Sequence, residues 1–245
     1  MEKVLALDFD GVIADTEHEC YIISIPAFRR MHEEIENTAR TRTEFRKARP
    51  YVKHADCYYT ILKILQDPKA TFDNISFEMF AKERDNNKKK GKEFHKLFYK
   101  EREKLQKNMD EWIKLNLPFD GIPNIIKRLM KSFPIVVVTA KDKNATQLLL
   151  NSYGLHIEKN NILSKEFSMD KKDCMRFISN KFNVTLDKII FVEDNLEQLM
   201  NVSELGVKFI MVSWGYSSQE QRKDAQDMGI LVADQENFET LIRSI

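Results

Sequence analysis

The sequence predicts an α/β protein, a Rossmann-like parallel sheet with an all-helical cap domain inserted after its first strand. Three observations favour this fold class. A short apolar run at 3–9 carries Asp8 near its end and is followed directly by Asp10. Residues 17–116 carry apolar side chains at helical spacing, and residues 117–245 alternate between apolar strands and amphipathic helices. Such alternation is typical of a parallel sheet covered on both faces. We therefore expect a discontinuous core of residues 1–16 and 117–245, and a helical cap of residues 17–116.

The inserted block favours helix throughout. Segments 58–66 (YYTILKILQ) and 94–106 (FHKLFYKEREKLQ) repeat apolar residues at helical spacing, and Gly91 is the only glycine in the block. Segment 82–107 is locally basic and includes three consecutive lysines at 88–90. Because acidic residues are interleaved with the basic ones, this segment favours a solvated helix face over a nucleic-acid surface.

The chain beyond the insertion supplies the remaining strands and helices of the core. Apolar runs predict strands at 134–140, 188–194, 207–215 and 230–234. Amphipathic segments predict helices at 122–132, 144–154, 170–182, 196–206 and 237–245, which connect and cover these strands. A polar helical segment is also expected between the last two strands. Two details support the helix ends: Asp170 is a typical N-cap residue, and Gly154 is a typical residue after a helix C-terminus.

Polar residues follow the predicted strands at their carboxyl ends, the edge at which open parallel sheets bind ligands. The residues brought to this edge carry carboxylate or hydroxyl groups: Asp8, Asp10, Thr139, Glu193, Asp194 and Ser213. A cluster of carboxylates is stable only if a cation or a shared proton compensates its charge. Oxygen ligands favour a hard cation, and Mg²⁺ is the best match. The sequence therefore predicts an acidic pocket that binds Mg²⁺.

A lysine is also expected at this edge. Lys171 and Lys172 lie in the first turn of the helix predicted at 170–182, where an ammonium group and backbone N–H groups can face an anion. Lys171 has Met175 and Ile178 four and seven residues later, so it borders the stripe that faces the sheet. Lys172 lies toward solvent, and the spacing therefore favours Lys171.

These motifs together resemble the haloacid dehalogenase-like hydrolase superfamily, in its phosphatase branch, which includes phosphoglycolate phosphatase-like proteins with a helical cap. The resemblance rests on four signatures in order: DFDGVIADT at 8–16, VVVTA at 136–140, Lys171 at a helix start, and FVEDN at 191–195. It extends over residues 1–16 and 117–245, but the insertion shows no motif that matches the family. The resemblance implies a phosphatase that acts on a small phosphorylated metabolite.

The resemblance also implies residue roles. Asp8 would be the nucleophile that forms an aspartyl-phosphate, and Asp10 would protonate the leaving oxygen and later deprotonate water. Thr139 and the backbone N–H of Ala140 would bind phosphoryl oxygens. Lys171 would offset the charge between Asp8 and the phosphate. The residues implied as Mg²⁺ ligands are Asp8, Asp10 through its carbonyl, and Asp194.

Several alternatives stay open at this point. The family often has a second metal-binding acidic residue at the position where this chain has Gln198. Asn195 and Glu197 lie nearby, so the residue that takes this role is undetermined. A dehalogenase needs neither Asp10 nor Asp194, and these two residues favour phosphate chemistry. A sugar phosphomutase or another phosphotransferase would use the same residues, and a phosphonate hydrolase would need a cap lysine. A non-catalytic binding protein would retain the fold with a broken signature.

Composition sets the remaining expectations. Apolar residues make up 42% of the 245 residues, charged residues make up 31%, and the formal net charge is +1, so no nucleic-acid partner is expected. The widely spaced Cys20, Cys57 and Cys174 argue against disulfides and a zinc site. The chain shows no signal peptide and no apolar run of about 18 residues, the length that a membrane span requires. We therefore expect a cytoplasmic protein that does not enter the membrane.

Overall fold

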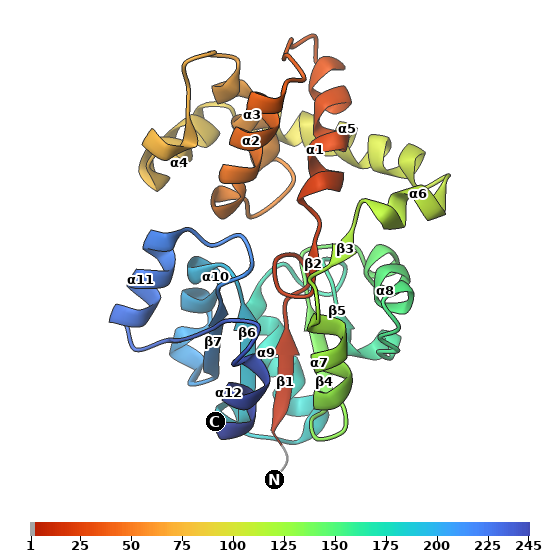
Figure 1. The fold of residues 1–245 in the computed structure, drawn as a ribbon, viewed down its shortest axis with the longest axis vertical. Helices are drawn as coiled ribbons and strands as arrows, with labels where there is room; N and C mark the ends of the chain where they lie inside the picture. The colour runs from red at the N-terminus through yellow and green to blue at the C-terminus, as the bar shows by residue number, and fades with distance from the viewer. Residues whose placement is uncertain (1–2) are drawn as a thin grey trace. The chain divides into compact units, whose positions relative to one another are not determined.

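The computed structural model describes residues 3–245 and divides the chain into two compact units (Figure 1). One unit runs to Asp15 and resumes over Leu117–Ile245, and the other is Thr16–Asn116. The chain therefore leaves the first unit after Asp15 and returns to it at Leu117, about a hundred residues later.

The first unit is built on a six-stranded parallel sheet in the order β5-β4-β1-β6-β7-β8. The strands are β1 (Val4–Leu7), β4 (Ile135–Val138), β5 (Ile162–Leu163), β6 (Ile189–Glu193), β7 (Lys208–Val212) and β8 (Leu231–Ala233). The predicted α/β class is confirmed. Each of the five strands predicted from the sequence is shorter than its apolar run, because residues at the ends of these runs belong to the loops.

The register of the central strands aligns their carboxyl ends. Leu7 of β1 pairs with Val137 of β4 on one side and with Val192 of β6 on the other. The backbone N–H of Asp8 continues the ladder by donating to the carbonyl of Val192 at 3.0 Å. The residues that follow these three strands therefore lie at one edge of the sheet.

Helices cover both faces of this sheet. They are α7 (Ile122–Leu129), α8 (Lys143–Ser152), α9 (Lys171–Phe182), α10 (Leu196–Asn201), α11 (Gln219–Asp227) and α12 (Phe238–Ser244). One core cluster joins alternate strand residues to buried side chains of α9, α10 and α11. In Figure 1, α7 and α12 lie on the near side of the sheet and α9 lies behind it.

Two features of this unit differ from the sequence-based prediction. The helix predicted at 196–206 ends at Asn201, and the 3₁₀ turn η5 (Ser203–Leu205) follows, because Asn, Val and Ser are weak helix formers. A second, two-stranded antiparallel sheet pairs β2 (Ala14–Asp15) with β3 (Leu117–Pro118). Two-residue strands are too short to produce an apolar period, so neither this pair nor β5 is visible in the sequence.

The second unit contains helices and no strands among its described residues. The helices are α1 (Glu17–Arg29), α2 (Ala39–Lys47), η1 (Arg49–Tyr51), α3 (Cys57–Leu65), η2 (Phe72–Asn74), α4 (Phe77–Asn86), α5 (Lys88–Leu105) and α6 (Met109–Lys114). A chain of aromatic contacts joins four of them through Tyr21, Phe45, Tyr58 and Phe98, with ring centroids 5.2–5.4 Å apart. This unit therefore has its own hydrophobic core.

A buried ion pair also ties three helices of the second unit together. Arg102 of α5 donates from Nε and Nη2 to the two carboxylate oxygens of Glu19 of α1, at 2.7 and 2.9 Å. The indole N–H of Trp112 in α6 donates to the same carboxylate at 2.6 Å. Both side chains are buried, and each has a partner of opposite charge.

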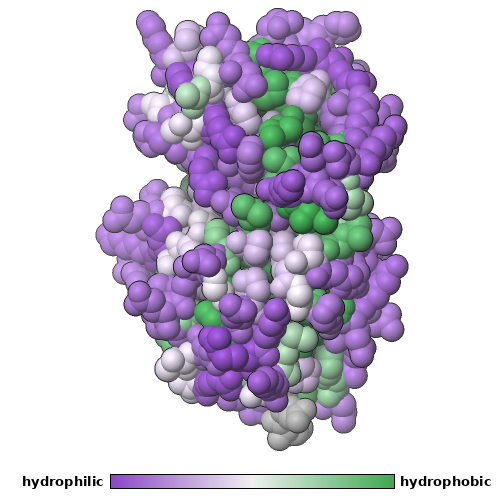
Figure 2. Space-filling model, turned by 45° about the vertical axis from the view of Figure 1, so that its right-hand side comes forward, coloured by the Kyte–Doolittle hydropathy of each residue, from purple (hydrophilic) through white to green (hydrophobic). Residues whose placement is uncertain are grey.

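The surface is mostly polar on the face drawn in Figure 2, where hydrophilic side chains predominate. Among residues 3–245, no helix is both long enough and apolar enough to span a lipid bilayer.

Candidate active site

The loop after β1 folds tightly around its glycine. The carbonyl of Phe9 accepts from the backbone N–H groups of Ile13 and Ala14, both at 3.0 Å, and Gly11 donates to the carbonyl of Ala14. Gly11 has a φ of +94°, and a Cβ at this position would lie 2.2 Å from Oδ2 of Asp194. Only glycine satisfies both demands, so the DxDG sequence lets this loop approach Asp194 closely.

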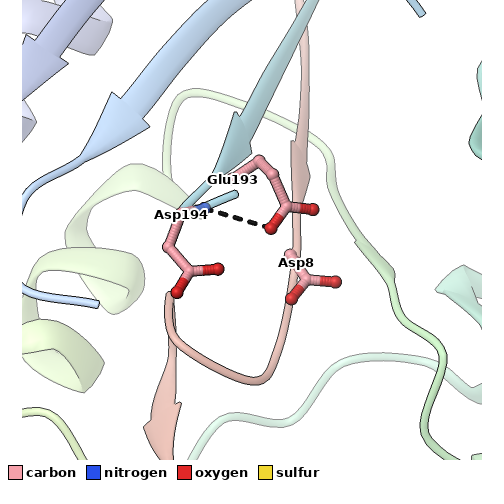
Figure 3. Close-up of side chains that lie close together, drawn as sticks. All are labelled: Asp8, Glu193 and Asp194. Atoms are coloured by element: carbon pink, nitrogen blue, oxygen red, sulfur yellow. Dashed lines mark hydrogen bonds between the residues drawn. The ribbon is translucent and has the colours of Figure 1, made fainter. Parts of the chain in front are cut away.

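Three buried carboxylates meet at the carboxyl ends of β1 and β6: Asp8, Glu193 and Asp194. One oxygen from each lies within 4.8 Å of the other two. Figure 3 shows their carboxyl groups close together, with Asp8 contributed by β1 and the other two by the end of β6. Three of the four carboxylates expected at this edge, Asp8, Glu193 and Asp194, therefore lie together.

Lys171 supplies the positive charge of this cluster. Its Nζ donates to Oδ1 of Asp8 at 2.6 Å and to the carbonyl of Val138 at 2.9 Å, and it lies 3.3 Å from Oε2 of Glu193. Lys172 instead pairs with the exposed Glu204 at 2.6 Å. The structure thus brings Lys171, and not Lys172, to the acidic cluster.

The charges of the cluster are not balanced. Burial is the main cause that raises the pKa of Asp8 to about 8, with the charge of Glu193 adding to it and Lys171 opposing it. Burial likewise raises the pKa of Glu193 to about 8, against the lowering effect of Lys171. Burial alone would lower the pKa of Lys171, but both carboxylates outweigh it and raise that pKa above its ordinary value. The cluster therefore favours an additional proton or cation.

Asp194 is fixed by the loop that follows β7. Its Oδ2 accepts from the backbone N–H of Tyr216 at 2.6 Å. A Cβ on Gly215 would lie 2.5 Å from Cβ of Asp194 and 2.4 Å from the carbonyl of Gly11, so only glycine fits here. The backbone of Asp194 is held as well, because its N–H donates to the carboxylate of Glu193 at 3.1 Å. The carboxylate of Asp194 is therefore held in one orientation.

The predicted phosphate-binding segment begins directly after β4. Thr139 is buried, and its backbone N–H donates to the carbonyl of Leu163 at 2.9 Å. Its hydroxyl oxygen accepts from the backbone N–H of Lys141 at 3.1 Å, so the hydroxyl can still donate to an oxygen of a ligand. Ala140 lies between these two residues and is half-buried.

Asp10 does not belong to the three-carboxylate cluster through its side chain. Its Oδ1 lies 3.3 Å from Nζ of Lys141, an ammonium group that is almost completely buried. Sequence reasoning missed Lys141, although its position two residues after Thr139 placed it at the same edge of the sheet.

The sequence left the second metal-binding acidic residue undetermined. Glu193 is a candidate for this role, and it precedes Asp194 in the chain instead of following it. Asn195 serves as the N-cap of α10, where its side chain accepts from the backbone N–H groups of Glu197 and Gln198. In the sequence, Glu193 stands at the end of a buried strand. This position fits a metal ligand and equally an N-cap residue of the helix that follows.

Proteins similar to this chain are found among solved structures and by a family model, but not among curated sequences. Among solved structures, a provisionally named phosphoglycolate phosphatase from Lactobacillus delbrueckii is 18% identical with a TM-score of 0.70 and 99% of each chain covered. A predicted phosphatase from Clostridium acetobutylicum is 16% identical with a TM-score of 0.66 and 100% of each chain covered. The haloacid dehalogenase-like hydrolase SP0104 from Streptococcus pneumoniae is 14% identical with a TM-score of 0.67, with 100% of this chain and 99% of that chain covered.

These similarities in structure establish a shared fold, since the identities are low. The family is established by sequence: the family model for haloacid dehalogenase-like hydrolases matches residues 2–200, which include every residue of the acidic cluster and Lys171. The chain belongs to the haloacid dehalogenase-like hydrolases.

Proposed function

We propose that this hydrolase is a Mg²⁺-dependent phosphatase that removes the phosphoryl group from a small phosphorylated metabolite through an aspartyl-phosphate on Asp8. The observation that carries the proposal is the Asp8 carboxylate, held 2.6 Å from the Lys171 ammonium inside a cluster of buried acids. A buried carboxylate beside a fixed cation suits a nucleophile for phosphorus. The phosphatase names of the structural neighbours support the same reaction class.

The donor set of the cluster fits Mg²⁺. Its carboxylate oxygens come within 4.8 Å of one another, and oxygen donors are the ligands this ion prefers. The raised pKa values of Asp8 and Glu193 support the same reading, because a cation can take the place of the proton. We assign the carboxylates of Asp8 and Asp194 and the backbone carbonyl of Asp10 as the groups that would bind Mg²⁺, with the carboxylate of Glu193 as an additional ligand. When bound, Mg²⁺ offsets the negative charge of the phosphoryl group.

The residues of the chain divide the chemistry among them. A carboxylate oxygen of Asp8 attacks phosphorus, the bond from phosphorus to the leaving oxygen breaks, and Asp10 gives its proton to that oxygen. Water then attacks phosphorus, Asp10 takes its proton, and the bond to Asp8 breaks. The sum is phosphomonoester and water to alcohol and phosphate. Thr139 and the N–H of Ala140 bind the phosphoryl oxygens, and Lys171 balances the charge at Asp8.

The test is hydrolysis of a panel of phosphorylated metabolites and p-nitrophenyl phosphate, with and without Mg²⁺. We expect phosphate release from at least one compound, loss of release when EDTA removes the metal, and loss of release in Asp8→Asn. A matched control is Lys172→Ala, because this lysine has the same charge in the same helix turn but pairs with Glu204 at the surface. Release that continues in Asp8→Asn would contradict the proposal.

A further inference from the structure

A second buried lysine lies at the site, and the chemistry proposed above gives it no task. The side chain of Lys141 is 2% exposed. Its Nζ lies 3.3 Å from Oδ1 of Asp10 and 5.8 Å from the centroid of the Phe9 ring. Burial of an ammonium group costs free energy unless an opposite charge compensates it, so a lysine at this position calls for an explanation.

The backbone of Lys141 is fixed on both sides. Its N–H donates to the hydroxyl of Thr139 at 3.1 Å, and its carbonyl accepts from the N–H of Lys165 at 3.3 Å. The next residue, Asp142, is the N-cap of α8 and accepts from the N–H of Ala145 at 2.8 Å. The lysine therefore extends from a rigid turn, and its reach toward Asp10 is set by the fold.

The two buried lysines contact different carboxylates. Lys171 bonds with Asp8 and contacts Glu193, whereas Lys141 contacts Asp10. Asp10 needs a fixed position because its carboxyl group must reach the leaving oxygen and, later, the water molecule. A hydrogen bond from a rigidly held ammonium group restricts the rotamers of the aspartate that accepts it.

We propose that Lys141 is a positioning residue that holds the side chain of Asp10 at the leaving oxygen, a role that rests on the proposed phosphatase function. The step that depends on Lys141 is the transfer of a proton from Asp10 to the leaving oxygen, which occurs as the bond from phosphorus to that oxygen breaks. Its importance therefore depends on how strongly the leaving group requires a proton.

This dependence separates positioning of Asp10 from binding of phosphate. An alkyl phosphate releases a strongly basic alkoxide and needs the proton, whereas p-nitrophenyl phosphate releases a weakly basic phenolate and needs it little. If Lys141 positions Asp10, its loss harms the alkyl substrate more. If Lys141 binds the phosphoryl group, its loss harms both substrates equally, because they share that group.

The experiment measures kcat and kcat/KM of Lys141→Met, Lys141→Arg and the control Lys172→Met with p-nitrophenyl phosphate and with an alkyl phosphate that the wild type hydrolyses. We expect Lys141→Met to lower kcat for the alkyl phosphate by about 100-fold and for p-nitrophenyl phosphate by less than about tenfold. Lys141→Arg keeps the charge and should recover part of the alkyl activity. Lys172→Met should match the wild type for both substrates.

Equal losses on the two substrates, or no loss, would overturn the role of Lys141 and leave the proposed function standing. No hydrolysis by the wild type of any phosphomonoester would overturn the proposed function itself, and the role of Lys141 with it. Two further measurements report on Lys141→Met: its melting temperature shows whether it is folded, and its Mg²⁺ affinity, measured by calorimetry, should equal that of the wild type. If Lys141→Met does not fold, Lys141→Arg is the deciding variant. The measured quantity is then the ratio of turnover of the alkyl phosphate to turnover of p-nitrophenyl phosphate. A positioning role predicts that this ratio falls below that of the wild type, and a phosphate-binding role predicts that it stays unchanged.

Discussion

The helical unit and the α/β unit each contain a buried ion pair, and the two pairs are balanced differently. In the helical unit one carboxylate, Glu19, meets one guanidinium, Arg102, and the indole N–H of Trp112 completes its hydrogen bonds. In the α/β unit one ammonium, Lys171, meets two carboxylates, Asp8 and Glu193, with Asp194 close by. The first arrangement is neutral and the second carries excess negative charge.

The difference separates a structural pair from a site that requires a ligand. A balanced pair is satisfied within the protein and contributes to the packing of its helices. An unbalanced cluster is not satisfied in this way. Burial, with the charge of a neighbouring carboxylate added, raises the pKa values of Asp8 and Glu193 to about 8 in spite of Lys171. Excess negative charge at the end of a sheet therefore identifies the functional site better than burial or ion pairing does.

The largest effect is expected from neutralising Asp8. Asp8→Asn should lower turnover of phosphomonoesters by about 10⁴-fold or more, because the amide cannot act as the nucleophile. The same change in the balanced pair, Glu19→Gln, should leave turnover per folded molecule within about threefold, since Glu19 takes no part in the proposed chemistry. Steady-state kinetics of both variants, corrected for the folded fraction, checks this. A comparable loss in both variants would remove the distinction between the two pairs.

The next effect is on stability. Arg102→Met should lower the free energy of unfolding by about 3–5 kcal/mol, because it leaves Glu19 buried without its charge partner. Arg176→Met is the control, as its exposed pair with Asp173 at 3.6 Å should contribute no more than about 0.5 kcal/mol. Urea unfolding of both variants measures the difference. Equal stabilities would mean that the buried pair does not hold the helical unit together.

A smaller effect is expected from pH in the absence of Mg²⁺. Asp8 and Glu193 have folded-state pKa values raised to about 8, well above those of the unfolded chain, so the folded protein binds more protons between about pH 4 and 8. The contribution of these two groups to stability is therefore highest below this range and falls as the pH rises through it. Mg²⁺ should restore the loss, and most strongly near pH 8. Melting curves across this range, with EDTA and with Mg²⁺, measure both effects, and stability that rises with pH in EDTA would contradict the charge imbalance.

The smallest effect concerns the acid that sequence reasoning left undetermined. Glu193→Gln should weaken Mg²⁺ binding by about tenfold, a size typical of the loss of one supporting group. The same variant should be more stable than the wild type near pH 8 without metal, because it removes one excess charge. Calorimetric titration with Mg²⁺ and melting in EDTA test the two statements together. Unchanged affinity would exclude Glu193 as a donor.

Strand and helix periodicity was enough to predict the fold class and the edge where the polar residues meet. The apolar runs before Asp8, Thr139 and Asp194 lie in adjacent parallel strands, so their ends had to coincide. Helical spacing likewise distinguished Lys171 from Lys172, because one borders the buried stripe and the other does not.

The roles of Lys141 and Glu193 and the pairing of β2 with β3 could not be predicted, because they depend on contacts between residues that a local sequence pattern does not reveal. Lys141 follows Thr139 in an ordinary polar loop, and only the folded chain shows its ammonium group beside Asp10. Glu193 could serve as an N-cap or as a ligand until its carboxylate was placed against Lys171. The pairing of β2 with β3 joins residues about a hundred positions apart through two-residue strands, which leave no period to detect.

The central claim is that Asp8 accepts the phosphoryl group, and trapping that residue tests it most directly. Acid quenching during turnover preserves an acyl phosphate, and borohydride then reduces it to an alcohol, which converts the aspartate into homoserine. We predict homoserine at position 8 by mass spectrometry of the wild type quenched with substrate and Mg²⁺, and unmodified aspartate when substrate is omitted. Sustained turnover with aspartate unmodified at position 8, or with the label at another residue, would contradict the account.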